Sequence, residues 1–362
     1  MNLITHGLRD GINYKIVVFA EILPNFSELE KYSNNFIFSR RKSIKIGNRS
    51  IFVYKKIDVT DENLIITEYA IRNLLTYSLL ASNKTPLLAF WGHGRTYTKR
   101  NTRVEEWLKT KLALRANWFF GYTAKGVDAL VAKGFPSEST TIVRNSTDTV
   151  ELSRFIENIR QEQVSIFRMQ QKLEDLPTAV FIGELGSSKR IDFLIASAIE
   201  IHNSLETFQL AIFGDGPELH KVLSACSKFS FIKYCGRADL ATLALVSKIG
   251  DCILMPGRVG LVAVDSLTLG LPIVTTNWRW HAPEIEYLTS GENCLILEDT
   301  LEDYSRGVVS LLSNNAMLEK LKRNCVRDSK FFSIEVMARN FHAGVLELLF
   351  QHRNLGEEMI ES

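Results

Sequence analysis

The sequence lacks a marked excess of charge of either sign, and it contains no apolar run long enough to cross a bilayer. Its 362 residues include 43 Lys and Arg against 41 Asp and Glu, a net charge of +2. A dedicated nucleic-acid-binding protein needs a strong basic excess, so this class is excluded. The N-terminal stretch MNLITHGLRDG has no basic region followed by an apolar core, and we expect no secretory signal.

Cysteine is scarce, and its spacing is irregular. The five cysteines lie in or beside apolar runs, and they have neither the even number of a disulfide framework nor the paired spacing of a zinc site. We therefore expect small buried side chains in a reducing cytoplasm. No cluster of carboxylates is evident, so we expect neither a metal nor another cofactor.

Two nucleotide-binding fingerprints are missing as well. Neither FIGELGSSKR (residues 181–190) nor FGDGPE (213–218) contains the pattern G-x-G-x-x-G, and no Walker loop occurs. A dehydrogenase that binds a nicotinamide dinucleotide is therefore a poor hypothesis. The chain is nevertheless longer than one core usually covers, so we expect two domains.

From residue 179 onward, short apolar segments alternate strongly with amphipathic ones. Apolar runs such as AVFIG and FQLAIFG alternate with helix-like segments such as RIDFLIASAIEIHN. This pattern predicts βαβ units and a parallel sheet covered on both faces. We therefore expect a doubly wound, Rossmann-like domain over residues 178–330.

The rest of the chain is divided less sharply. The first half also mixes strand-like segments such as PLLAFWG with helix-like ones such as AKGVDALVAKG, which indicates a second α/β domain over residues 1–149. Residues 150–177 are polar and helix-prone, and we interpret them as a connector. We expect a C-terminal helix over residues 331–362 that packs back towards the first domain.

The stretch PGRVGLVAVDSLTLGLPIVTT (residues 256–276) lies between two expected strands. Gly257 and Gly260 come at the carboxyl end of the first strand, where the ligands of open parallel sheets bind. A helix that begins beside Gly260 and Leu261 points free amides and a partial positive charge into this crevice. Asp265 is placed to accept hydrogen bonds from sugar hydroxyls. A plain strand–helix–strand unit with glycines at its tight turns explains the same spacing equally well.

A second anion-binding signal follows the first strand of this domain. In FIGELGSSKR, a turn of small residues leads to Lys189 and Arg190 at the start of a helix. Backbone donors and fixed cations suit a diphosphate, and a βα loop with two solvated charges is the alternative. An anion held between two turns of one sheet, with an acid beside it for hydroxyls, describes a nucleotide diphosphate that carries a ribose.

In order and content, these segments resemble the family-4 glycosyltransferases of group 1 type, which are retaining enzymes of the GT-B architecture. FIGELGSSKRIDFLIASA is similar to their strand, loop and helix, AIFGDGPEL to their GdGp turn, and residues 231–276 to their donor-site block. HAPEIEYLTSGENCLIL resembles the Pro-Glu and Gly-x-Asn segment that follows. The resemblance runs from about residue 87 to residue 350.

The resemblance implies two Rossmann-like domains that face a cleft, with the acceptor on the N-terminal side and the donor on the C-terminal side. It implies retaining, metal-independent transfer of a sugar from a UDP- or GDP-linked donor to a hydroxyl. The implied acceptor is a glycan or a lipid-linked glycan in surface polysaccharide or lipopolysaccharide synthesis. Lys189, Arg190, Arg258 and the amides near Gly260 would then stabilise the departing diphosphate.

Three departures from the family pattern favour a different hypothesis, a degenerate GT-B protein that binds a nucleotide or a partner without catalysis. The family has two glutamates separated by seven residues where this chain has Gly257 and Asp265. The family's arginine before the loop lysine is Glu184 here, so Arg190 or Arg258 must supply the second cation. NLITHGLRDGINYKIVVFAE resembles the end of the family's first helix and its second strand, which predicts an N-terminal domain shortened at its start.

In the first half, PLLAFWGHGRTYTKR places His93 and Arg95 at the carboxyl end of an expected strand. The resemblance implies that His93 is catalytic, because family members have a histidine near this place, and that Arg95 contacts the donor. A structural histidine in a tight turn is the alternative. We expect His281 to serve loop packing, and Glu284 either to cap the segment that follows or to touch the donor.

Basic residues cluster at SRRKSIKIGNR (residues 39–49) and at RTYTKRNTR (residues 95–103). The second cluster leads into an amphipathic segment that contains Trp107, Leu108, Leu112 and Leu114. Such surfaces attract anionic lipid headgroups, and a solvated basic face is the other interpretation. We expect a cytoplasmic protein, placed at the inner face of the membrane if this peripheral contact exists.

Overall fold

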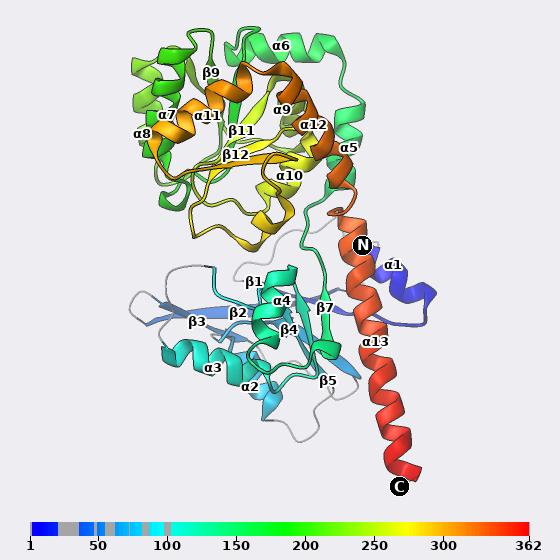
Figure 1. Cartoon of the computed structure of the whole chain (residues 1–362). Helices are drawn as coiled ribbons and strands as arrows, with labels where there is room; N and C mark the ends of the chain where they lie inside the picture. Colours follow the sequence, from blue (N-terminus) through cyan, green and yellow to red (C-terminus); the bar gives the residue numbers. More distant parts are fainter. Residues whose placement is uncertain are drawn as a thin grey trace. The chain divides into compact units, whose positions relative to one another are not determined.

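The computed structural model describes residues 2–20, 36–46, 49–54, 62–71, 73–81, 87–97 and 103–361. Its backbone divides into two units (Figure 1). The first unit comprises Met1–Arg144 and Glu335–Ser362, and the second comprises Asn145–Ile334. The chain therefore leaves the first unit once and returns to it with its last helix.

The second unit is built on one sheet of six strands, in which every neighbouring pair is parallel. The strand order is β10-β9-β8-β11-β12-β13. The strands are β8 (Thr178–Ile182), β9 (Gln209–Phe213), β10 (Ile232–Tyr234), β11 (Cys252–Leu254), β12 (Ile273–Thr276) and β13 (Cys294–Leu297). Every residue of β8, β9, β11 and β12 is buried, as expected for a parallel sheet that helices cover on both faces.

Helices follow the strands of this sheet and enclose one continuous core (Figure 1). The α-helices are α5 (Thr149–Glu157), α6 (Gln161–Gln171), α7 (Ile191–Ser204), α8 (Leu219–Lys228), α9 (Leu240–Ile249), α10 (Val262–Leu269), α11 (Leu301–Leu312) and α12 (Asn315–Ser329). Two short 3₁₀ turns, η3 (Ser187–Lys189) and η4 (Pro283–Tyr287), lie in loops. Helix α7 packs beside α8 and α11, whereas α9 and α10 pack beside α5.

The residues that the sequence assigned to a connector, 150–177, form most of α5 and all of α6. Asp148 caps α5, because its side chain accepts a hydrogen bond from the amide of Glu151 at 3.2 Å. Leu152 of α5 and Phe167 of α6 are buried in the core of the second unit. The two helices are therefore part of that unit and pack on its strand-linking helices.

The first unit contains a parallel sheet of four strands in the order β4-β5-β6-β7, and a second sheet in the order β1-β2-β3. The strands are β1 (Ile16–Ala20), β2 (Phe36–Ile46), β3 (Arg49–Tyr54), β4 (Leu64–Glu68), β5 (Leu87–Gly92), β6 (Trp118–Gly121) and β7 (Thr140–Ile142). The helices are α1 (Asn2–Arg9), α2 (Leu74–Leu80), α3 (Arg103–Ala113), α4 (Ala124–Val131), η2 (Ser137–Ser139) and α13 (Ile334–Glu361).

Alternation along β5 and β6 builds a core on each face of the four-stranded sheet. Phe90 and Phe119 belong to one cluster, with side chains from α2, α3 and α4. Phe120 belongs to the other cluster, where it stacks on Phe341 of α13 with ring centroids 4.4 Å apart. Successive side chains of a strand point to opposite faces, so the same two strands support both cores. The predicted class, an α/β protein with two Rossmann-like domains, is confirmed.

Strands β2 and β3 form an antiparallel hairpin that the sequence analysis did not predict. Ile46 pairs with Arg49, and the two residues between them in the sequence, Gly47 and Asn48, lie outside the described residues. A Gly-Asn pair between two strand-like runs is a strong hairpin signal. The alternating residues of SRRKSIKIGNR had been interpreted only through their charge.

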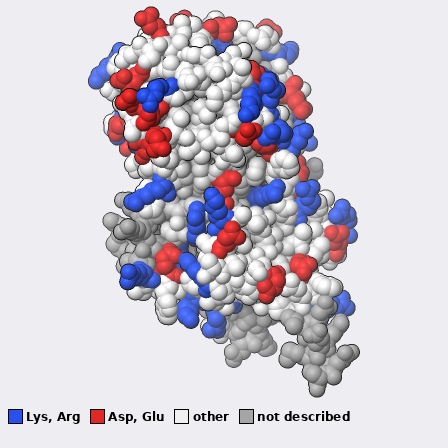
Figure 2. Space-filling view, viewed as in Figure 1, with Lys and Arg blue, Asp and Glu red and all other residues white. Residues whose placement is uncertain are grey.

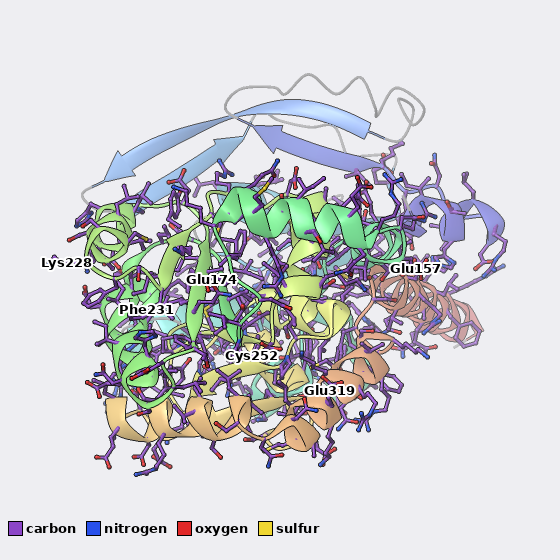
Figure 3. The ribbon with its side chains drawn as sticks, turned by 90° about the horizontal axis from the view of Figure 1, so that it is seen from above. Glu157, Glu174, Lys228, Phe231, Cys252 and Glu319 are labelled. Atoms are coloured by element: carbon purple, nitrogen blue, oxygen red, sulfur yellow. The ribbon has the colours of Figure 1, made fainter. Side chains whose placement is uncertain are left out.

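All five cysteines are buried or half-buried. Cys252, Cys294 and Cys325 are buried, and Cys226 and Cys235 are half-buried. Cys252 lies in the interior of the second unit, whereas the labelled Lys228 and Glu319 lie at its rim (Figure 3).

Acidic and basic side chains are interspersed on the face of the second unit that Figure 2 shows. No helix among the described residues is long and apolar enough to cross a membrane.

Candidate functional site

The second unit changes direction between β8 and β11, and this places two loops side by side. The chain runs from β8 through β9 to β10 on one side, and from β11 through β12 to β13 on the other. Ala179 pairs with Cys252 and Val180 with Ile253, so the carboxyl ends of the two strands are adjacent. Open parallel sheets bind their ligands at such a topological switch point.

The loop after β8 and the turn after β11 touch through their main chains. The amide of Arg258 donates a hydrogen bond to the carbonyl oxygen of Ser188 at 2.8 Å. The Nζ of Lys189 donates to the carbonyl oxygen of Arg258 at 2.5 Å. The structure thus brings together Lys189, Gly257 and Arg258, three of the residues that the sequence predicted for the site.

Gly257 has no room for a side chain in this arrangement. A Cβ atom there would lie 2.5 Å from the carbonyl oxygen of Ser188 and 2.7 Å from the Cα of Lys189. Both of these atoms belong to the backbone, which moves less easily than the end of a flexible side chain. The missing acid at position 257 is therefore accompanied by a loop packed against the place that the acid would occupy.

Gly214 and Gly216, in the loop after β9, lie against the loop after β8. They were not among the residues predicted for the site. The amide of Gly183 donates to the carbonyl of Phe213 at 3.0 Å, and that of Leu185 to Asp215 at 2.9 Å. A Cβ at Gly216 would lie 2.6 Å from the carbonyl oxygen of Leu185. Two glycines two residues apart directly after a strand are the signal that predicts such a close approach.

Lys189 is mostly withdrawn from water between the two loops. Burial, and after it repulsion from Arg258, lowers the pKa of Lys189 to about 8, while Glu184 opposes the shift. Glu184, which stands where the family has an arginine, therefore favours the charged form of the lysine. The ammonium keeps donors beyond the one it gives to Arg258, because it has three N–H groups.

Arg190 lies next to this contact, but its guanidinium is held by an acid. The residue has a left-handed backbone (φ 57°), and its side chain forms an ion pair with Asp299, which follows β13. It also donates to the carbonyl oxygen of Pro256 at 3.2 Å and lies 4.3 Å from the ring centre of Phe193. Asp299 was not expected at the site, and nothing local in the sequence indicates this pair.

Arg258 is anchored on the opposite side of the turn. Its guanidinium donates to the carbonyl oxygen of Trp280 at 3.0 Å, and burial lowers its pKa. His281 braces the same turn, because its Nδ1 accepts from the amide of Val259 at 3.1 Å. Its Nε2 donates to the carbonyl of Thr276 at 2.9 Å, which defines the neutral tautomer. Burial lowers the pKa of His281, in keeping with the packing role expected for it.

The start of α10 presents free donors beside these cations. Among the described residues, the amides of Gly260, Leu261 and Val262 have no hydrogen-bond acceptor, whereas that of Ala263 bonds to the carbonyl of Gly260 at 2.9 Å. Unpaired amides at a helix start carry a partial positive charge and bind anions. The side chain of Leu261 is exposed.

Asp265 lies one turn further along α10, where water is largely excluded. Burial raises its pKa to about 6, and the hydrogen bond from Thr147 opposes this shift. That hydroxyl donates to Oδ1 of Asp265 at 3.0 Å. Nearby, the buried Glu284 accepts from the side-chain amide of Asn145 at 2.8 Å. Glu284 therefore holds the segment that precedes α5.

His93 and Arg95 belong to the first unit, where they follow β5. The His93 side chain is exposed, and its ring packs edge-on against Tyr122 with centroids 4.6 Å apart. The Arg95 guanidinium lies 4.4 Å from the ring centre of Tyr97. Gly126 of α4 packs closely on the carbonyl group of His93, because a Cβ atom there would lie 2.4 Å from that oxygen. Helix α4 therefore fixes the position of the loop that carries His93.

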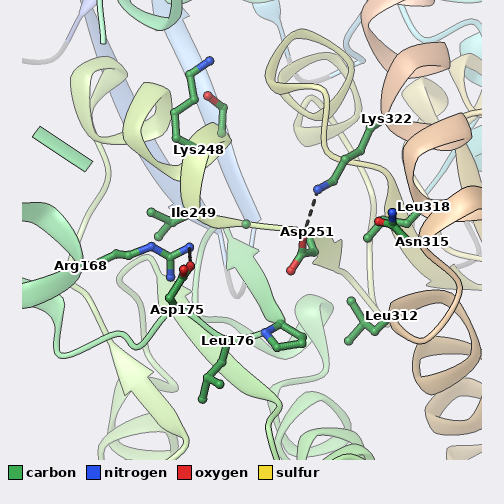
Figure 4. A pocket seen from close by; sticks show the side chains of 13 residues that line it. Arg168, Asp175, Leu176, Lys248, Ile249, Asp251, Leu312, Asn315, Leu318 and Lys322 are labelled. Atoms are coloured by element: carbon green, nitrogen blue, oxygen red, sulfur yellow. Dashed lines mark hydrogen bonds and ion pairs between the residues drawn. The ribbon is translucent and has the colours of Figure 1, made fainter. Parts of the chain in front are cut away.

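A hollow of about 400 Å³ lies at the other end of the sheet of the second unit (Figure 4). Asp251 there pairs with Lys322 at 3.0 Å, and Arg168 pairs with Asp175 at 3.3 Å. The hollow contains none of the residues predicted for the site. Within the part of the chain that the structure describes, no three His, Cys, Asp or Glu side chains are grouped as a metal site requires.

Two parallel-sheet units, one with anion-directed loops at its switch point, define an α/β protein of the GT-B type. Residues 176–314 match the family model described as "Glycosyl transferases group 1". This segment is therefore similar to a group 1 glycosyltransferase domain, and the comparisons support an enzyme of the glycosyltransferase class.

Relatives and solved structures agree with this class. The chain is 24% identical to an α-D-kanosaminyltransferase of Streptomyces kanamyceticus over 163 residues, 43% of this chain and 42% of that enzyme. It is 22% identical to an uncharacterized glycosyltransferase of Methanocaldococcus jannaschii over 86% of this chain and 84% of that protein. The crystal structure of Anabaena HepE in complex with UDP shares the fold, with a TM-score of 0.71, 13% identity and coverage of 95% and 94%.

The tight packing at Gly257 predicts that alanine substitution lowers the stability of the protein at Gly257 but hardly changes it at Gly260. Gly257→Ala forces the two loops apart and destabilises the second unit by about 1–3 kcal/mol. Gly260→Ala is the matched control, since a Cβ there meets only the side chain of Ala282, at 3.5 Å. It changes stability by less than about 1 kcal/mol. Urea unfolding of both variants measures the difference, and equal stabilities would show that the loops do not touch as described.

Proposed function

We propose that this chain transfers a sugar from a nucleoside diphosphate sugar to a hydroxyl acceptor. The observation that carries the proposal is the contact between Lys189 and the turn of Gly257 and Arg258, beside the free amides at the start of α10. These groups converge at the switch point of a Rossmann-like sheet, where nucleotides bind. The kanosaminyltransferase and the UDP complex of HepE support a nucleotide-sugar donor.

The charge that develops on a departing diphosphate needs donors that are already in place. Lys189 offers its remaining N–H groups, and the amides of Gly260, Leu261 and Val262 offer theirs together with the helix dipole. Preorganised donors lower the barrier without reorganisation in the transition state. We assign these groups to the diphosphate and propose metal-independent transfer, with retention of configuration as in family-4 enzymes.

The remaining predicted residues have more specific roles in this proposal. Asp265 accepts hydrogen bonds from the ribose of a UDP- or GDP-linked donor through the carboxylate oxygen that Thr147 leaves open. Arg190 positions the loop through Asp299, and Arg258 adds positive charge beside Lys189. His93 and Arg95 of the first unit contact the donor sugar, with His93 as the catalytic group.

The acceptor side of the reaction follows the same assignment. We propose that residues 1–149 bind the acceptor, a glycan or lipid-linked glycan of surface polysaccharide or lipopolysaccharide synthesis, and that residues 178–330 bind the donor. The reaction would take place in the cytoplasm, at the inner face of the membrane. Incubation with panels of UDP- and GDP-sugars, with product and free nucleotide measured, tests the activity directly.

A second function is favoured by two observations at the site. Arg190 is already neutralised by Asp299, and the position of the missing acid at Gly257 is filled by backbone. A protein that binds a nucleotide without catalysis would show saturable UDP or GDP binding with no transfer and no donor hydrolysis. Turnover that disappears in Lys189→Ala, with binding weakened in parallel, supports the enzyme instead.

Nucleotide affinity should fall as the pH rises through about 8, because the free Lys189 loses its proton there and a neutral amine cannot pair with phosphate. Lys189→Met should weaken UDP or GDP binding roughly ten- to a hundred-fold at pH 7 and remove this pH dependence. Titration calorimetry from pH 7 to 9 measures both effects. The exposed Lys248, at the other end of the sheet, supplies the control Lys248→Met, and parallel pH profiles for all three proteins would contradict the assignment.

Asp265 predicts a second pH dependence, on the acid side. Its pKa of about 6 means that the carboxylate is charged above this pH and neutral below it, so affinity for a ribonucleotide should fall as the pH drops below 6. Asp265→Asn keeps an acceptor for Thr147, and it should weaken binding by about ten-fold at pH 7.5 and flatten the profile. A 2′,3′-dideoxynucleoside diphosphate is the control ligand. If the variant weakens its binding equally, Asp265 does not contact the ribose.

His93→Ala should lower kcat by about a hundred-fold or more, because general acid–base or electrostatic catalysis by one side chain contributes at least about this much. The dissociation constant for the donor should change by less than about three-fold, since the diphosphate contacts are untouched. His220→Ala, an exposed histidine of α8 in the second unit, is the matched control. Equal, small effects on kcat and affinity would leave His93 with a structural role.

A further inference from the structure

Helix α3 of the first unit turns a row of large apolar side chains towards the solvent. Val104, Trp107, Leu108 and Leu114 are 65%, 58%, 45% and 39% exposed. Leu114 follows the last helical residue, and its amide still bonds to the carbonyl of Thr110 at 3.0 Å, so the helical path continues through it. Most surface helices bury their apolar stripe, so an exposed row of apolar side chains indicates a binding surface.

The other exposed residues of the same segment are all cations. Arg103, Lys111 and Arg115 are exposed, and at 100° per residue they share one arc of about 140° with the four apolar side chains. We call these seven residues the outward face of α3. No carboxylate lies within it.

The acids of α3 lie outside this face and are partly covered. Glu106 accepts a hydrogen bond from Thr96 at 2.6 Å and forms an ion pair with Lys133 at 3.0 Å. Glu105 is half-buried, and Leu112 and Ala113 are buried. Leu112, named in the same amphipathic segment, lies on the buried side and belongs to the core with Phe90 and Phe119.

We propose that the outward face of α3 docks on an anionic lipid bilayer. Trp and aliphatic side chains enter the boundary between headgroups and acyl chains, while Lys and Arg beside them pair with anionic headgroups. A protein partner with an apolar patch would bury the four apolar side chains but would offer no anions to the three cations. An anionic membrane provides both an apolar layer and negative charge. This surface goes beyond the proposed transfer reaction, since its binding needs neither donor nor acceptor.

Flotation of the full chain with phosphatidylcholine vesicles, with and without phosphatidylglycerol, tests the proposal. The protein should float with the anionic vesicles only, and high salt should release most of it. Lys111→Glu combined with Arg115→Glu should weaken vesicle binding by at least about ten-fold, since each cation near an anionic surface contributes about five-fold. Trp107→Ser combined with Leu108→Ser should weaken it comparably, by removing the inserted side chains.

Matched controls come from α8 of the second unit, where Leu223 is 49% exposed and Lys228 is also exposed. Leu223→Ser combined with Lys228→Glu should leave vesicle binding unchanged. Far-UV circular dichroism and thermal unfolding confirm that every variant is folded, which the exposure of the changed residues favours.

Three outcomes would overturn the proposal. They are no binding of the folded wild-type chain to anionic vesicles, equal binding by the α3 variants and the wild type, and equal binding to neutral and anionic vesicles. Light scattering tests whether a second copy of the chain, rather than a membrane, binds to the same face. A wild-type dimer that Trp107→Ser converts to a monomer, without vesicle binding, would assign the face to a second copy of the chain.

Discussion

The main-chain contact between the loop after β8 and the turn after β11 is the constraint on which the candidate site depends. The amide of Arg258 bonds to the carbonyl of Ser188, and Gly257 leaves nothing between the two backbones. The strands that carry these segments are neighbours at the point where the sheet reverses its direction of winding. The half-buried Lys189 and the free amides at the start of α10 are placed by this one contact.

This close packing also explains why the cations of the site differ in character. Lys189 is withdrawn from water, and burial lowers its pKa to about 8, so its charge lacks full compensation in the free protein. Arg190 is neutralised by Asp299, and Arg258 is held by the carbonyl of Trp280. On the proposed function, an arriving diphosphate therefore gains most from Lys189 and the free amides, while the arginines keep the loops in place.

Local sequence patterns were reliable wherever the physics is local. The apolar runs from residue 179 onward became buried parallel strands, because a fully covered sheet demands continuous hydrophobic segments. The β2–β3 hairpin was not predicted, because its strand residues lie in a segment that was interpreted as a basic cluster. For α3, the amphipathic character was evident, but only the structure shows that Leu112 faces inward while Trp107 and Leu108 face the solvent.

The sequence by itself determined the fold class and predicted the strand ends, glycines and lysine of the candidate site, because these depend on hydrophobic period and turn chemistry within a few residues. The tertiary structure alone decided that Asp299 neutralises Arg190 across more than a hundred residues and that backbone fills the space at Gly257. It also decided how far Lys189 and Asp265 are desolvated. Partner choice and burial depend on which distant segments the sheet order brings together, and no local pattern encodes that order.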